Sequence, residues 1–309
     1  MATQDKARAP GTIKAYNREK RSYIKFCVKN HIDPLKPSSM DVCIYIEFVM
    51  ESGVSPSTLK NKLAAIRKYV RLSGGCVKGV NSERVSLALD AFQRSKVHVS
   101  NKKDPISIRD FKAVLDIQPD NYIGNSVKSM LLILFFGAFR QSEIAPVTCH
   151  SFDPSVSMCR RDIKIKQDKL YISLRWAKNQ QKYTEIRKLC IPSIEDKKYC
   201  PVSNLMKVLK SSPSDKRSDP LFMFKDKRPI TVGFLKNAWK KSLSSLNINN
   251  KLFTLHSVRK AAASSAFDMG CSELHIRRYA WNSDAHLSYI KTSSQNVVTK
   301  ALARAIQKK

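Results

Sequence analysis

The sequence predicts a mainly α-helical protein with one small antiparallel sheet, an α+β fold in which a helical N-terminal domain precedes a larger mixed domain. Apolar residues recur at helical spacing through residues 12–94 and again over 201–306, whereas they alternate with polar residues over 162–192, as a half-buried sheet requires. Residues 95–104, between the two domains, are polar and basic and lack apolar periodicity. That composition is typical of a linker.

The N-terminal domain is predicted to hold four helices, after a flexible segment at residues 1–11. They are expected at residues 13–30, 40–51, 58–72 and 82–93. Hydroxyl side chains suited to cap the first three helices stand just before them or at their start: Thr12, Ser38 with Ser39, and Ser55 or Ser57.

The helix at 58–72 is the best candidate in this domain for the major groove of DNA. One of its faces is an apolar stripe made of Leu59, Leu63, Ile66 and Val70, which is expected to face the core. Basic residues on the other faces would mostly contact phosphates, which position a protein without specifying sequence. These residues are Lys60, Lys62, Arg67 and Arg71.

The larger domain, residues 105–309, is predicted to open with a helix at 107–117 that Ser107 caps. Residues 127–139 are apolar on all sides, which predicts a buried helix. Three strands are expected within 162–192, with turns near residues 167–168 and 179–182. The remaining helices are expected at 201–210, 231–245, 254–269, 271–280, 283–291 and 294–306.

Net charge restricts the partner. The 309 residues include 56 Lys and Arg against 25 Asp and Glu, a formal charge of +31, and both halves of the chain are basic. Such a field favours a polyanion, and a distribution over both domains fits a long phosphate backbone. No apolar segment is long enough to span a membrane. We expect an intracellular protein, nuclear if its host is eukaryotic.

The eight cysteines argue against two classes of small stabilised fold. They form no Cys-x-x-Cys pair and no cluster with histidine, so neither a structural zinc site nor a secreted disulfide framework is expected. The thiols are therefore interpreted as reduced, and no metal site is predicted.

Two segments place cationic side chains at the ends of predicted helices. Arg140 follows the buried helix, and Glu143 can hold its guanidinium as a fork for phosphate oxygens. The pair can equally be structural. His256 and Arg259 share the start of another helix, where anions are favoured, although this spacing alone is weak evidence.

Two further residues acquire a role only in combination with the first two segments. Lys178 lies at a predicted hairpin tip, where lysines are usually only solvated, and Tyr289 lies on a late helix, where tyrosines are usually core residues. The order Arg-x-Ser-Glu, hairpin Lys, His-x-x-Arg, Trp and Tyr resembles the catalytic domain of the tyrosine recombinase (phage integrase) family. Residues 12–94 resemble its SAM-like core-binding domain. The string from Trp281 to Ile290 is similar to the eukaryotic Crypton and DIRS-like mobile elements.

The resemblance implies a C-shaped clamp on double-stranded DNA and a site-specific recombinase or transposase that needs no metal ion, cofactor or ATP. Tyr289 would attack a phosphodiester and form a 3′-phosphotyrosyl bond, with Lys178 as the general acid to the 5′-oxygen. Arg140 and Arg259 would bind the non-bridging oxygens. The other roles implied are orientation of Arg140 by Glu143, proton transfer by His256, and phosphate binding or packing by Trp281.

The sequence departs from the family just before the nucleophile. Where the family has Gly before His or Arg, this chain has Tyr279 and Ala280, and Trp281 follows one place later. Trp281 is therefore the better candidate for the usual His or Trp position, and His286 the poorer one. Tyr279 has the wrong spacing for an alternative nucleophile.

Residues 294–309 are predicted to form a basic amphipathic helix with two possible roles. It would pack on its own domain or, as the resemblance implies, dock on a neighbouring protomer and build a tetramer on two DNA duplexes. Two other functions remain open. One is a non-catalytic, domesticated DNA-binding protein of the same fold, and the other is a monomeric enzyme similar to type IB topoisomerases.

Overall fold

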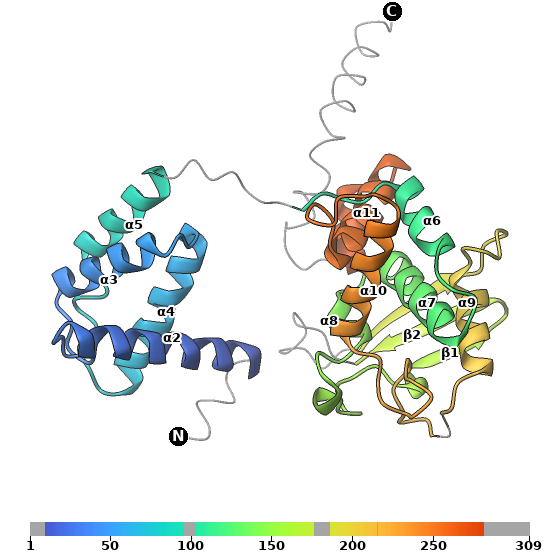
Figure 1. Ribbon diagram of the computed structural model, residues 1–309, viewed down its shortest axis with the longest axis horizontal. Helices are drawn as coiled ribbons and strands as arrows, with labels where there is room; N and C mark the ends of the chain where they lie inside the picture. Colours follow the sequence, from blue (N-terminus) through green and yellow to red (C-terminus); the bar gives the residue numbers. More distant parts are fainter. Residues whose placement is uncertain (1–9, 96–102, 176–185, 215, 281–309) are drawn as a thin grey trace, which may run out of the picture. The chain divides into compact units, whose positions relative to one another are not determined.

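The computed structural model describes residues 10–95, 103–175, 186–214 and 216–280 (Figure 1). The chain divides into two compact units, residues 1–101 and 102–309. The fold is mainly helical with one three-stranded antiparallel sheet, so the predicted fold class is confirmed. Most of the predicted linker, residues 96–102, lies outside the described residues.

The first unit consists, in its described part, of four helices around one apolar core. They are α2 (Pro10–Lys29), α3 (Ser39–Glu51), α4 (Pro56–Leu72) and α5 (Glu83–Ser95). The predicted apolar stripe of α4 is buried in this core, together with Tyr23 and Phe26 of α2 and Tyr45 of α3. The core is thus built from helix faces at the spacing that the sequence showed.

Local capping explains where these helices begin. Ser38 caps α3 by accepting from the N–H of Asp41, whose carboxylate accepts from the N–H of Ser38 at 2.8 Å. Ser55 caps α4, and Pro56 occupies its first turn, where a missing N–H costs nothing. The predicted cap of the first helix is wrong: Thr12 lies inside α2, which already includes Pro10.

The second unit surrounds its sheet with helices. In chain order they are α6 (Ile108–Asp116), α7 (Tyr122–Phe136), the short α8 (Gln141–Ile144), α9 (Pro201–Lys210), α10 (Val232–Ser245), α11 (Leu255–Asp268) and α12 (Glu273–Ala280). Helix α7 runs through the core, in contact with α9 and α11, and α9 also packs against the strands β2 (Lys169–Leu174) and β3 (Arg187–Pro192). Residues Met130–Leu134 of α7 are all buried.

Helix α7 begins and ends earlier than predicted. Its cap is Asn121, whose side chain accepts from the N–H of Gly124 at 2.9 Å, so the helix starts five residues before the apolar run. It ends at Phe136, and the chain then turns at Gly137 and Ala138, where Ala138 has a positive φ of 44°. This turn delivers Phe139 to the core and Arg140 to the start of α8.

The sheet has the order β1-β2-β3, with β1 at Ile163–Lys166, β2 at Lys169–Leu174 and β3 at Arg187–Pro192. Gln167 and Asp168 form the predicted first turn, both with positive φ. One face of the sheet packs on the core through Leu170, Ile172, Leu189 and Ile191. The second predicted turn, near 179–182, lies outside the described residues.

The described residues contain neither a candidate membrane span nor a candidate metal site. No helix there is long and apolar enough to cross a membrane. No group of three or more His, Cys, Asp or Glu side chains there could hold a metal ion. All eight cysteines lie in the described part of the chain, and each is a free thiol.

Candidate functional site

The candidate site is built around the turn that follows α7. Arg140 is the N-cap residue of α8. The carboxylate of Glu143 accepts hydrogen bonds from the backbone N–H of Arg140 (2.7 Å) and from the Nη1 of Arg140 (2.9 Å). The Glu143 side chain is 1% exposed, whereas that of Arg140 is 27% exposed. A buried carboxylate therefore fixes a guanidinium that still reaches the surface, which suits phosphate binding.

Helix α11 supplies the second arginine. Arg259 is buried, at 1% exposure, and its guanidinium donates to two backbone carbonyls. Its Nη1 binds the oxygen of Ala138, in the turn before Arg140, and its Nη2 binds that of Ala280, the last residue of α12, at 2.6 Å. Arg259 thus connects the turn after α7 with the end of α12.

His256 lies one turn before Arg259 on α11 and keeps part of its ring at the surface. Burial lowers the pKa of this imidazole to about 4, and the positive charges of Arg259, Lys260 and Arg140 lower it in the same direction. His256 is therefore neutral at pH 7. Arg259, Lys260 and Arg140 are therefore close enough to His256 for their charges to act on its ring.

Arg187, the first residue of β3, belongs to the same site and was missed by sequence reasoning. Its Nη2 donates to the carbonyls of Gly137 (3.2 Å) and Tyr279 (2.5 Å). Its guanidinium also lies over the rings of Phe139 and Tyr279, at 5.3 and 5.6 Å from their centroids. Burial lowers the pKa of the Arg187 guanidinium, and the negative charge of Glu143 offsets part of this decrease. No motif surrounds it in the sequence.

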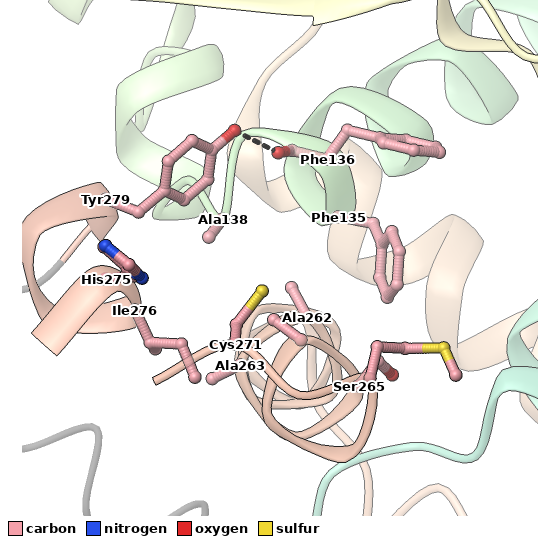
Figure 2. A pocket seen from close by; sticks show the side chains of 12 residues that line it. Phe135, Phe136, Ala138, Ala262, Ala263, Ser265, Cys271, His275, Ile276 and Tyr279 are labelled. Atoms are coloured by element: carbon pink, nitrogen blue, oxygen red, sulfur yellow. Dashed lines mark hydrogen bonds between the residues drawn. The ribbon is translucent and has the colours of Figure 1, made fainter. Parts of the chain in front are cut away.

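The phenol of Tyr279 makes the third bond to this turn. Its hydroxyl donates to the carbonyl of Phe136 at 2.6 Å, as Figure 2 shows, and burial raises its pKa. The carbonyls of Phe136, Gly137 and Ala138 are therefore bound in succession by Tyr279, Arg187 and Arg259. A tyrosine held in this way is poorly suited to act as a nucleophile.

An apolar pocket of about 410 Å³ opens beside these contacts, between the end of α7, α11 and α12 (Figure 2). Phe135, Phe136, Ala262, Ile276 and Tyr279 are among the residues that line it. Met269, at its rim, is 83% exposed.

The structure brings together four of the seven predicted catalytic residues: Arg140, Glu143, His256 and Arg259. The other three, Lys178, Trp281 and Tyr289, lie outside the described residues, as do His286 and the predicted helix at 294–309.

The predicted DNA-contacting residues of α4 differ in what they bind. Lys62 forms an ion pair with Glu19 of α2, and its side chain is only 17% exposed. Arg67 donates to Asn81, and Lys60 donates to Gln93 at 3.1 Å. Arg71 is exposed at the end of the helix. Lys62 is thus committed to holding two helices together rather than open to a ligand.

Comparison with known proteins identifies both the N-terminal region and the fold. Residues 3–72 match the family model described as the phage integrase N-terminal SAM-like domain. No curated protein sequence matches the chain.

Three solved structures bound to DNA are similar over most of the chain. The Tn1549 transposon integrase with transposon right end DNA has a TM-score of 0.57 at 14% identity, covering 86% of this chain and 85% of that one. The XerH site-specific recombinase in a post-cleavage complex with palindromic difH has a TM-score of 0.60 at 13% identity, covering 85% and 71%. A lambda integrase dimer on a COC′ core site has a TM-score of 0.55 at 12% identity, covering 92% and 72%. The chain therefore has the fold of the tyrosine recombinases.

Proposed function

We propose that this protein is a site-specific DNA recombinase that cuts and rejoins strands through a covalent bond to Tyr289. One observation carries the proposal: Arg140, held by Glu143, and Arg259 with His256 of α11 meet at the turn after α7, in a fold shared with DNA-bound integrases. The guanidinium of Arg140, which reaches the surface beside a neutral imidazole, suits a phosphodiester, whose charge increases at the non-bridging oxygens during transfer, and the buried Arg259 adds positive charge behind it.

The proposed reaction balances without an external energy source. The Tyr289 phenolate oxygen attacks phosphorus, a 3′-phosphotyrosyl bond forms, and the bond to the 5′-oxygen breaks. Lys178 delivers a proton to that oxygen, and the 5′-hydroxyl of a new strand reverses the step. Arg140 and Arg259 stabilise the charge on the phosphoryl oxygens, and Trp281 contributes an indole N–H. The sequence similarity to Crypton and DIRS-like elements favours transposition as the biological setting.

The protonation state of His256 limits its role. Because its pKa is about 4, the imidazole is neutral at physiological pH and offers one N–H donor and one acceptor nitrogen. It can therefore donate a hydrogen bond to the phosphate, whereas a pKa this low makes it a weak base, so the proton of the attacking phenol passes to solvent. It does not act there as a cationic acid.

We further propose a division of labour between the two units and a multimeric assembly. Residues 12–94 bind double-stranded DNA through α4, with Arg71 as a phosphate contact, and residues 105–309 perform the chemistry. The helix expected at 294–309 docks on a neighbouring protomer, giving a tetramer on two duplexes. The pocket between α7, α11 and α12 offers an apolar surface that suits the apolar face of this helix.

Trapping the covalent intermediate tests the proposal. The probe is a pool of duplexes with a randomised core and a nick that lets the short fragment carrying the freed 5′-hydroxyl diffuse away. We expect wild-type protein to form an adduct that resists denaturation, with the nucleotide on the Tyr289 peptide by mass spectrometry. Tyr289→Phe should bind the pool equally well and form no adduct.

Each alternative function predicts another result. A pool that binds wild-type protein tightly yet yields no adduct would indicate a DNA-binding protein without catalysis. An adduct formed by Tyr289→Phe would show that another residue is the nucleophile. An adduct formed by a protein that stays monomeric on DNA would favour an enzyme of the topoisomerase kind.

A further inference from the structure

The open face of the sheet carries a concentration of positive charge that the proposed catalytic site does not use. On β1–β3, alternation places one set of side chains in the core and the other set outward. The outward set includes four exposed lysines: Lys164, Lys166, Lys169 and Lys188. A hollow of about 520 Å³ on this side is lined by Lys164 and Lys166 together with the exposed Arg161 and Arg217. We call the four lysines and these two arginines the basic sheet face.

Strand register shows that this face is arranged at a cost in stability. Lys166 on β1 stands directly opposite Lys169 on β2. Like charges at directly opposite positions destabilise a sheet. Tyr171, which faces Lys164 in the same register, is 37% exposed and adds an aromatic surface between the lysines.

Within the part of the chain that the structure describes, acidic side chains do not balance the charge of the basic sheet face. The strands themselves contain none. Asp162, at the edge of the hollow, is 5% exposed, and its two carboxylate oxygens accept from Arg175 at 2.6 and 2.8 Å. Asp168 lies in the turn between β1 and β2, at one end of the face. One exposed carboxylate, that of Asp168, therefore stands beside the pair Lys166 and Lys169, and the face as a whole keeps an excess of positive charge.

We propose that the basic sheet face binds the phosphate backbone of DNA as a second contact surface, separate from α4 and from the site at Arg140. Lysines two residues apart on one strand lie about 6.7 Å from each other, so Lys164 and Lys166 form a row that can reach neighbouring phosphates. Lysine contacts of this kind position DNA without reading its sequence. The proposal rests on the proposed function only in taking DNA as the ligand.

The salt dependence of DNA binding gives the test. The logarithm of the binding constant falls linearly with the logarithm of the salt concentration, and each phosphate that the protein no longer neutralises reduces the steepness of this slope by about 0.9. The full-length triple variant Lys164→Gln/Lys166→Gln/Lys169→Gln is compared with Lys236→Gln/Lys240→Gln/Lys241→Gln, three exposed lysines of α10. Both variants remove three charges from the same unit. On a mixed-sequence duplex pool, we expect the sheet variant to reduce the slope by about 2–3 and the α10 variant to reduce it by less than about 1.

A second variant separates binding from folding. Lys166→Glu converts the repulsive pair with Lys169 into an attractive one, so its Tm should equal or exceed that of wild type while DNA affinity falls at least about tenfold. Equal slopes for the two triple variants would overturn the proposal, as would a Lys166→Glu protein that binds DNA like wild type. Covalent adduct formation is a separate readout, so failure here and failure of the catalytic proposal are distinguishable.

Discussion

Replacement of Arg187 by Met is the sharpest test of how the site is held together. Methionine keeps an apolar stem of similar length but removes the two hydrogen bonds to Gly137 and Tyr279 and the contacts with two aromatic rings. Hydrogen bonds from a charged donor contribute about 1.5–3 kcal/mol each, and each ring contact about 0.5–1 kcal/mol. Desolvation of the guanidinium, visible in its lowered pKa, offsets part of this sum.

We therefore expect Arg187→Met to lower the free energy of unfolding by about 2–4 kcal/mol. For a unit of this size that corresponds to a fall in Tm of roughly 5–12 °C. Lys188→Met is the matched control for stability alone, because Lys188 is the next residue, exposed, on the opposite face of the sheet, where it belongs to the basic sheet face. A surface substitution of that kind should change stability by less than about 0.5 kcal/mol.

Denaturant unfolding followed by tryptophan fluorescence measures the stability of both variants, and adduct formation by Arg187→Met, compared with wild type, measures the consequence for function. Arg187 ties the turn before Arg140 to the end of α12, from which the chain continues toward Tyr289. Adduct formation should therefore fall more than DNA affinity, and Arg187→Lys should recover part of it. If Arg187→Met is as stable as Lys188→Met and forms adduct at the wild-type rate, the bonding network has no role in either property.

Three other predictions follow from the same structure. Glu143→Gln weakens the hydrogen bonds that position Arg140, and it should slow adduct formation by about 10- to 100-fold, the effect expected from one charged hydrogen bond. The Kd for duplex DNA should change less than about threefold. An adduct-formation rate unchanged from wild type would contradict the positioning of Arg140 by Glu143. The folded-state pKa of His256 is depressed to about 4, so as pH falls the imidazole is protonated in the unfolded chain before it is protonated in the folded protein. The contribution of His256 to stability is therefore fully present above pH 6.5 and is lost as pH falls toward 4. Unfolding curves of wild type and His256→Gln between pH 4 and 7 should show a smaller pH dependence of stability in the variant. Lys62→Gln removes one of the two ion pairs of Glu19, which is 7% exposed, and leaves the pair with the exposed Arg18. It should destabilise the first unit by about 1–2 kcal/mol, whereas Lys60→Gln should cost less than about 0.5 kcal/mol. Equal unfolding midpoints would show that the ion pair between Lys62 and Glu19 contributes nothing.

Local signals in the sequence were sufficient for much of the fold. Ser38, Ser55 and Ser107 cap the helices that follow them, and alternation of apolar residues located all three strands. These features depend on neighbours within a few residues, which a pattern contains. The start of α7 was predicted too late because Gly124, Asn125 and Ser126 interrupt the apolar character that the rest of the helix shows.

The contacts of the site could be predicted only in part. Arg140 and Glu143 are three residues apart, so their pairing could be anticipated from spacing. Lys62 and Glu19 are 43 residues apart, and Arg187 and Tyr279 are 92 apart. Pairings over such separations depend on how helices and strands pack, which periodicity does not specify.

The turn at Phe136–Ala138 has a consequence for how the length of this chain can vary. Its three successive carbonyls are bound by side chains from three separate elements, α12, β3 and α11. Inserting or deleting one residue here would shift every carbonyl relative to its donor, so three bonds would break together and Arg140 would be displaced. Surface loops generally tolerate insertions, but this short connection is expected to keep a fixed length in any related sequence that retains Tyr279, Arg187 and Arg259.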